Sequence, residues 1–331
     1  MKVPFLGILL ALISTVTRLF GQVSSLSVQV SQFAGDRAAA ISYTFDDGLR
    51  DQYTLAVPML NEVGFKGTFF VIPSKVSETI EDAERRKNDK RAWGTITWDE
   101  LREMARQGHE IGSHTWSHTG LTKQLPEEVD AELSKSYDAI KTRLGQPPLT
   151  IAFPFNQSTP EIQAAALKHY VAYRDHQLGV GSPKSTVDWL NKWADQQVRD
   201  HKWGVIMAHA IGSGYAAFAD PDILRAHLQY VKSHEKDIWV DTFANVARYT
   251  KERDNTKVTI LSSGSGHVTF TLACALDPGI YNVPLTLVFE KPGATSVHAE
   301  CAGSALAVQI LHGSIQIDVV PSKNPIAVTW K

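Results

Sequence analysis

The chain has 331 residues, 43% of them hydrophobic, and a formal net charge of −2 at pH 7. This length allows one large hydrophobic core and a second, smaller one. A near-neutral chain without a cluster of lysine and arginine lacks the electrostatic footprint of a nucleic-acid-binding protein. The densest charged stretch, residues 81–91, mixes both signs and is typical of a solvated loop or helix face. We therefore expect a globular protein with no nucleic-acid partner.

The N-terminal residues have the layout of a secretory signal. Lys2 precedes a largely apolar run at residues 3–16, and small or polar residues follow at 21–25. The apolar run is too short to span a bilayer comfortably. We expect residues 1–21 to be a signal peptide, and the mature protein to be secreted or periplasmic with no membrane span. Because Arg18 and Leu19 make a poor cleavage site, an uncleaved anchor is the alternative.

Residues 38–250 alternate between short apolar runs and amphipathic stretches. The strand-like runs are residues 38–45, 66–72, 109–114, 150–155, 170–174, 203–209 and 237–240, and the helical stretches are 53–63, 98–106, 126–144, 160–169, 186–200 and 221–233. This pattern predicts an α/β fold, a distorted parallel (β/α) barrel of about seven strands, which we assign to residues 30–253. An open doubly wound sheet is the alternative, but the sequence has no glycine-rich phosphate loop to support it.

After residue 253 the pattern changes to short β-type runs separated by glycine and proline turns. The runs are residues 258–260, 268–272, 285–289, 306–311 and 315–320. They predict a small all-β, sandwich-like domain at residues 254–331. The two cysteines of the chain, Cys274 and Cys301, lie here, and the sequence leaves open whether they form a disulfide or remain free thiols.

Polar residues follow several of the predicted barrel strands. In parallel α/β barrels the reactive residues lie at the carboxyl ends of the strands, so these residues are expected to converge on one mouth. They include Asp46 and Asp47 after the first strand, His114 and His118 after the third, Arg174 at the end of the fifth and His209 at the end of the sixth.

The spacing of His114 and His118 allows both imidazoles to bind one ion. Two histidines and one carboxylate form the ligand set typical of a catalytic zinc, although two surface histidines would also explain the pattern. Neighbouring carboxylates repel each other unless a positive group lies nearby, and successive strand side chains diverge. We therefore assign Asp47 to the ion and Asp46 to a water. Zinc is the first choice, with cobalt or another divalent ion as alternatives.

This arrangement predicts hydrolysis of a carbonyl compound. The ion lowers the pKa of the water, Asp46 takes its proton as general base, and the ion polarises the carbonyl oxygen. His209 approaches from another strand end and is placed to protonate the leaving group as general acid.

Four motifs occur in the order seen in the polysaccharide deacetylases of carbohydrate esterase family 4, the nodulation-type deacetylase domain. They are TFDDG at residues 44–48, SHTWSH at 113–118, FPF at 153–155 and MAH at 207–209, and the resemblance extends over residues 38–250. It implies a metal-dependent hydrolase that removes N-acetyl, less often O-acetyl, groups from an acetylated glycan such as chitin oligomers, peptidoglycan or acetylxylan. It implies the roles given above for Asp46, Asp47, His114, His118 and His209, and places the backbone amide of Phe155 at the oxyanion.

The sequence departs from the family pattern at two points. An arginine usually precedes the proline of the third motif by two residues, where this chain has Ala152. Arg174 is the candidate replacement, since a cation near Asp46 would keep it ionised; an arginine paired at the barrel rim is the alternative. The acid that tunes the general-acid histidine is also ambiguous, and Asp188 is favoured over Asp175.

Two other functions are compatible with parts of the pattern. A catalytically inactive glycan-binding protein would explain the missing arginine, but it has no need of both Asp46 and His209. A glycoside hydrolase needs two acids that flank one bond and would leave the histidines unused. Trp116 and Trp189 are candidates for stacking on sugar rings. The sequence does not indicate an oligomeric state.

Overall fold

The structure is a computed structural model, which describes residues 27–87, 94–182, 184–290, 293–311 and 313–331. The predicted signal peptide lies outside the described residues. Within those ranges, none of the helices has both the length and the apolar character needed to cross a membrane.

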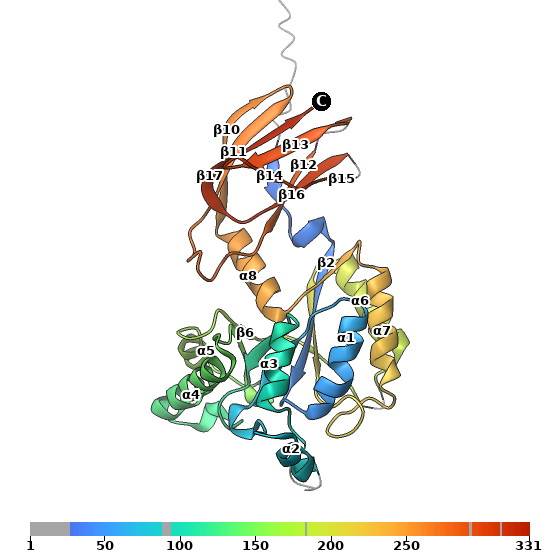
Figure 1. The fold of residues 1–331 in the computed structure, drawn as a ribbon, viewed down its shortest axis with the longest axis vertical. Coiled ribbons are helices and arrows are strands. Elements are labelled where there is room, and N and C mark those ends of the chain that lie inside the picture. The colour runs from blue at the N-terminus through green and yellow to red at the C-terminus, as the bar shows by residue number, and fades with distance from the viewer. Residues whose placement is uncertain (1–26, 88–93, 183, 291–292, 312) are drawn as a thin grey trace, which may run out of the picture.

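A curled parallel sheet forms the centre of the larger domain (Figure 1). Its strands lie in the order β6-β5-β4-β3-β2-β8-β7, and β9 also pairs with β2. Their bounds are β2 (Ala39–Asp46), β3 (Thr68–Val71), β4 (Glu110–Ser113), β5 (Thr150–Ala152), β6 (Ala172–Arg174), β7 (Leu178–Gly179), β8 (Trp203–Ala208) and β9 (Ile238–Val240). The predicted distorted parallel barrel is confirmed. β6 and β7 form the two edges of the curl, and the two-residue β7 was not predicted.

Helices lie around the sheet and at its two ends. They are α1 (Val57–Glu62), α2 (Ile80–Lys87), α3 (Trp98–Arg106), α4 (Pro126–Leu144), α5 (Pro160–Ala166), α6 (Val187–Asp200), α7 (Asp222–Ser233) and α8 (Phe243–Asp254). Their ends follow local chemistry. The Thr97 hydroxyl accepts a hydrogen bond from the Glu100 amide, and the Glu100 carboxylate accepts one from the Thr97 amide, which begins α3 with a capping box. Gly145, with a φ of 76°, ends α4 in the left-handed conformation.

The central strand β2 is buried along its whole length. Ile41, Tyr43 and Phe45 belong to the main core, which also includes apolar residues of α1 and α7. Because side chains alternate along a strand, Ser42, Thr44 and Asp46 point to the other face, inside the curl. This alternation carries Asp46 into the interior at the carboxyl end of β2.

Two antiparallel sheets form the smaller domain. Their orders are β1-β12-β16-β15 and β10-β11-β17-β13-β14, and side chains of both sheets share one core. The strands are β1 (Val28–Val30), β10 (Thr256–Gly264), β11 (His267–Cys274), β12 (Leu285–Glu290), β13 (Val297–Cys301), β14 (Ser304–Leu306), β15 (Val308–Leu311), β16 (Ser314–Val319) and β17 (Ser322–Trp330). The sandwich therefore includes β1, a strand from before the barrel. Both cysteines are free thiols.

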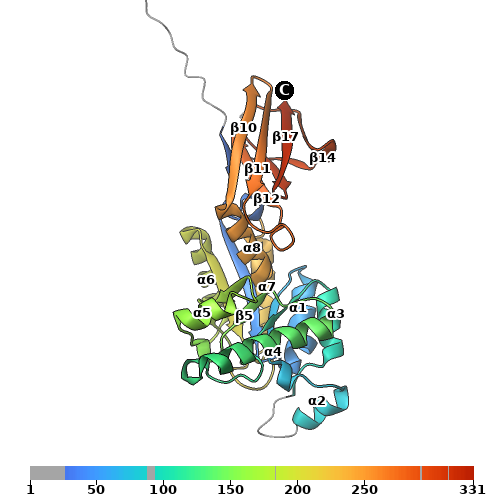
Figure 2. The same ribbon diagram turned by 90° about the vertical axis from the view of Figure 1, so that its left-hand side faces the viewer.

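The sandwich stacks on one end of the barrel, and α8 lies at the junction (Figures 1 and 2). The amides of Phe243 and Ala244 donate to Thr68 and Glu110, at the amino ends of β3 and β4. Further along α8, the Tyr249 hydroxyl donates to the Ser31 carbonyl, and the Glu252 carboxylate accepts from the Val283 amide. The sandwich thus covers the amino ends of the strands, and α2 lies at the opposite end of the molecule (Figure 2).

Candidate active site

A cavity of about 890 Å³ opens at the carboxyl ends of the barrel strands. The residues that line it come from the ends of β2, β3, β5 and β8, from the loop after β4, from α2 and from the residues just before α3. They are Asp46, Asp47, Leu49, Ile72, Lys75, Arg86, Thr95, His114, His118, Phe153, Phe155, Asn156, Met207, His209 and Tyr215. We predicted that the polar residues at the strand ends lie around one cavity. The structure places Asp46, Asp47, His114, His118 and His209 in the lining of this cavity.

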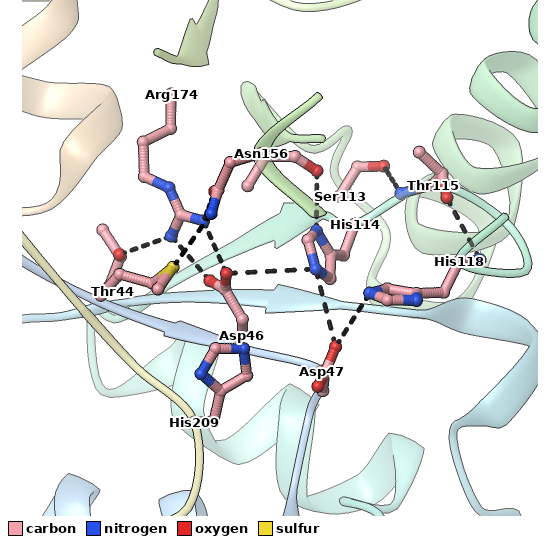
Figure 3. Close-up of polar contacts among 12 residues, drawn as sticks. Thr44, Asp46, Asp47, Ser113, His114, Thr115, His118, Asn156, Arg174 and His209 are labelled. Atoms are coloured by element: carbon pink, nitrogen blue, oxygen red, sulfur yellow. Dashed lines mark hydrogen bonds and ion pairs between the residues drawn. The ribbon is translucent and has the colours of Figure 1, made fainter. Parts of the chain in front are cut away.

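Asp47, His114 and His118 converge within the cavity (Figure 3). His114 Nδ1 donates to the Ala152 carbonyl oxygen at 2.7 Å, so its Nε2 is the nitrogen that faces the cluster. Asp47 Oδ1 lies 3.6 Å from His114 Nε2 and 3.4 Å from His118 Nε2. Burial lowers the pKa of both histidines, that of His118 to about 4, so both rings are neutral at neutral pH.

The donor set of this cluster fits a divalent cation. Among the described residues, the buried Asp47 Oδ1 has no hydrogen-bond partner. A carboxylate oxygen and two neutral imidazoles together offer three electron-pair donors at the separations that ligands of one ion require. A positive ion between them would satisfy Asp47 and use both nitrogens, and two histidines with one carboxylate suit zinc.

The loop after β4 is shaped to hold His118. The Ser117 amide and hydroxyl both donate to the Glu132 carboxylate, which ties the loop to α4. Asp47 and His118 have φ angles of 75° and 65°, in the left-handed region that non-glycine residues seldom adopt. Such conformations persist only where the surrounding contacts enforce them, and they concentrate at functional sites.

Asp46 is paired with Arg174 inside the barrel. Arg174 Nη1 donates to Asp46 Oδ1 at 2.7 Å, and Nη2 donates to Oδ2 at 2.5 Å. Nη1 also donates to the Thr44 hydroxyl at 2.8 Å, and the guanidinium lies over the Phe70 ring. Burial on its own would raise the pKa of Asp46, which is 2% exposed, but the charge and hydrogen bonds of Arg174 outweigh it, and the net effect lowers the pKa.

Arg174 lies directly beside Ala152, the position at which the sequence lacks the arginine of the third motif. Ala152 on β5 is the direct register partner of Arg174 on β6. Neighbouring strands of a parallel sheet are about 4.8 Å apart, so a long side chain from β6 reaches the space that an arginine at Ala152 would occupy. The guanidinium that contacts Asp46 thus comes from β6, the strand next to β5.

His209 lies on the opposite side of Asp46 from Arg174 (Figure 3). Its ring packs edge-on against Tyr215 at a centroid distance of 5.0 Å. Two residues that the sequence analysis missed hold this region in place. The buried Gln52 amide donates to the carbonyl oxygens of both Asp46 and His209. Asp51 Oδ2 accepts from the backbone amides of residues 211–213, just after His209.

Other predicted site residues lie elsewhere. Asp188 does not line the cavity: it lies on the exposed surface of α6 and pairs with Lys192 at 2.8 Å. Trp189, 40% exposed, and the partly buried Trp116 are also outside the lining. Phe155 does line the cavity, with a φ of 58°, and its ring packs against His118 at a centroid distance of 4.8 Å.

The larger domain is a curled parallel (β/α) barrel. Asp47, His114 and His118 form a candidate metal site at the carboxyl ends of its strands. The model of the polysaccharide deacetylase family matches residues 35–173, which contain β2 to β5, Asp46, Asp47, His114 and His118. Over these residues the barrel domain is similar to the polysaccharide deacetylase family.

Individual relatives match different parts of the chain. A gellan lyase from Bacillus sp is 22% identical over 91% of this chain and 13% of its own length. Chitin deacetylase 1 from Cryptococcus neoformans var. grubii is 32% identical over 37% of this chain and 22% of its own length. This chain thus spans less than a quarter of either relative. A solved structure assigned to the polysaccharide deacetylases, from Mycobacterium smegmatis, has a TM-score of 0.50 at 15% identity, covering 71% of this chain and 98% of that one. This likeness supports the fold.

Proposed function

We propose that the protein is a metal-dependent polysaccharide deacetylase, a hydrolase that removes N-acetyl, or alternatively O-acetyl, groups from a glycan. The observation that carries the proposal is that the Asp47, His114 and His118 cluster shares one cavity with Asp46, and that Arg174 pairs with Asp46 behind the cavity wall. The first supplies a cation site, and the second supplies an acid held ionised beside it. The family of the barrel domain supports the same reaction class.

Asp47, His114 and His118 would hold one divalent ion, with zinc as the first choice and cobalt or another divalent ion as alternatives. When bound, such an ion polarises the acetyl carbonyl and makes a nearby water more acidic. The hydrogen bond from His114 Nδ1 to the Ala152 carbonyl fixes the orientation of the ring, the kind of support that metal-binding histidines require.

Asp46 is the proposed general base. As a water oxygen attacks the acetyl carbonyl carbon, the Asp46 carboxylate accepts the proton that the water loses. The lowered pKa of Asp46 keeps the carboxylate ionised at neutral and mildly acidic pH. Arg174 contacts Asp46 rather than the cavity, so its proposed role is to position and charge-stabilise the base.

His209 is the proposed general acid. When the bond between the carbonyl carbon and the amide nitrogen breaks, His209 donates a proton to that nitrogen, and the products are acetate and an amine. For an O-acetyl group the same proton goes to the sugar oxygen. The backbone amide of Phe155 remains the proposed donor to the oxyanion, consistent with its place in the cavity wall.

We further propose that the protein acts outside the cytoplasm, after removal of a signal peptide at residues 1–21. This proposal rests on the N-terminal sequence pattern. Chitin oligomers, peptidoglycan and acetylxylan are the candidate acetylated glycans.

The test is acetate release from these three glycans by the zinc-loaded protein. We expect release from at least one of them, loss of release after chelation, and recovery when zinc is restored. Asp46→Asn should reduce the rate at least about a hundredfold, since it removes the base. Asp130→Asn, at an exposed position of α4 outside the cavity, is the matched control. Binding without turnover, or release of reducing sugar without acetate, would overturn the proposal.

A further inference from the structure

Two cationic side chains, Lys75 and Arg86, line the cavity beside the proposed metal site. Neither takes part in the chemistry proposed above. Lys75 ends a short 3-10 helix, Pro73–Lys75, just after β3, and Arg86 is in the last turn of α2.

The backbone of Lys75 is held firmly. Its carbonyl oxygen accepts from the Thr95 hydroxyl at 2.7 Å and from Arg86 Nη1 at 2.8 Å. The neighbouring Ser74 amide donates to the Trp116 carbonyl, which ties this turn to the loop that carries His118. The backbone position from which the Lys75 side chain extends is therefore fixed relative to the proposed metal site.

The ammonium group of Lys75 is not neutralised within the described part of the chain. Lys75 is exposed, and no ion pair is found between it and any acidic residue there. Lys75 thus lines the cavity and has no acidic partner among the described residues.

Arg86 adds a second, partly compensated charge. Asp82 lies 3.3 Å from Arg86 Nε and also 2.7 Å from Arg85 Nη2. One carboxylate is shared between two guanidinium groups, so Asp82 compensates the charge of Arg86 only in part.

The acidic residues of the cavity do not offset this positive wall. Asp46 and Asp47 are the acidic residues among those that line it. Arg174 neutralises Asp46, and Asp47 is the proposed ligand of a divalent cation. A cleft lined by one sign of charge attracts ligands of the opposite sign and orients them.

We propose that Lys75 and Arg86 bind a sugar carboxylate, so that the preferred substrate is an acetylated acidic glycan in which a carboxylated sugar lies next to the acetylated one. The inference rests on the proposed deacetylase function and specifies its substrate class. The carboxylate could belong to either of two kinds of sugar. One is a hexuronate within the glycan, and the other is an amino sugar that carries a carboxyl group on an ether substituent. Lys75 and Arg86 are specificity-determining residues, since the reacting atoms lie at Asp46 and the metal cluster.

The test compares each acidic glycan with its own neutralised form. One arm uses oligosaccharides of alternating glucuronate and N-acetylglucosamine, and a second uses glycan strands with N-acetylmuramic acid. In each arm the carboxylates are left free or converted to methylamides, which leaves the acetyl groups intact. KM and kcat for acetate release are measured with the zinc-loaded protein at low and high salt.

We expect KM to be about five- to tenfold lower for the charged form in at least one arm, and this advantage to shrink at high salt. Lys75→Gln should bring the ratio of the two KM values to within about twofold of one. Lys75→Arg should keep most of the preference, because it keeps the charge. Lys135→Gln, at an exposed position of α4 outside the cavity, is the matched control and should behave as the wild type.

A binding measurement separates this inference from the proposed function. Calorimetric titration of the zinc-loaded Asp46→Asn variant with the charged and amidated oligosaccharides reports carboxylate recognition without turnover. If binding depends on the carboxylate but the wild type releases no acetate, the deacetylase proposal is wrong and the proposed recognition of a sugar carboxylate is supported. Equal KM values, or equal affinities, for charged and amidated forms in both arms would overturn the inference.

Discussion

Arg174 holds both carboxylate oxygens of Asp46, with contacts of 2.7 and 2.5 Å, while the two side chains are buried inside the barrel. Arg174→Lys would keep a positive charge but lose the planar two-point contact. We expect the acidic limb of the kcat/KM–pH profile to move to higher pH, because the pKa of Asp46 is no longer held as low, and kcat to fall about tenfold or more.

The measurement for Arg174→Lys is a full pH–rate profile. Arg199→Lys, on the exposed side of α6, is its control. A variant whose acidic limb coincides with that of the wild type would show that Arg174 does not set the charge of Asp46.

His118→Ala should abolish stabilisation of the protein by zinc. A ligand that binds only the folded state raises its stability by RT ln(1 + [L]/Kd), so the wild-type melting temperature should rise when zinc is added to metal-free protein. With one of three ligands removed, the rise should largely disappear. His176→Ala, at an exposed histidine outside the cluster, should respond as the wild type does. An undiminished rise in His118→Ala would place the ion elsewhere.

Gln52→Leu should lower kcat and leave KM nearly unchanged. The Gln52 amide donates to the carbonyl oxygens of Asp46 and His209, at 2.5 and 3.0 Å, and so joins the backbones that carry the proposed base and acid. Gln52 lies in a π-helical turn, Gln52–Ala56, a local distortion found often at functional sites. We expect a loss of about tenfold in kcat, with KM within about twofold. Gln196→Leu, exposed on α6, is the control. A proportional rise in KM would point to a role in binding instead.

The metal-free protein should lose stability as the pH falls from 6.5 towards 4. His227 is buried, its Nδ1 donates to Asn191, and its Nε2 accepts from the Tyr43 hydroxyl. Burial lowers the pKa of His227 from 6.5 to about 4. Between these values the unfolded chain binds more protons, so the stabilisation is complete above pH 6.5 and declines as the pH approaches 4, by up to about 3 kcal/mol.

Urea unfolding of metal-free wild type and His227→Gln at several pH values measures this contribution. Glutamine cannot titrate, so the variant should show a shallower dependence on pH. Parallel curves for the two proteins would mean that His227 is already neutral in the unfolded chain or still charged in the folded one.

The barrel was predictable because each of its seven main strands is a separate apolar run, and parallel strands must place their carboxyl ends on one side. That rule brought Asp46, Asp47, His114, His118 and His209 to one mouth. Arg174 could be proposed as a candidate, but its contact with Asp46 depends on the register of Ala152 and Arg174 across two short strands, which the sequence does not encode locally.

The contacts that could not be predicted are mostly between a side chain and backbone atoms. Such contacts produce no recognisable pattern in the sequence. Gln52 and Asp51 bind carbonyls and amides more than 150 residues away. Asp188 was favoured because a tryptophan follows it, but the phase of α6 turns it to solvent. β17 was missed because Pro325 interrupts its pattern, and the pairing of β11 with β17 shifts register at this point.

The stacking of the sandwich on the amino ends of the strands decides which way the cavity faces. β1 and β17, near the two ends of the described chain, both belong to the sandwich. If the protein were attached to a surface or to a fusion partner through β1 or β17, the sandwich would lie between the attachment point and the barrel. The mouth with Asp47 and His118 would then point away from the point of attachment.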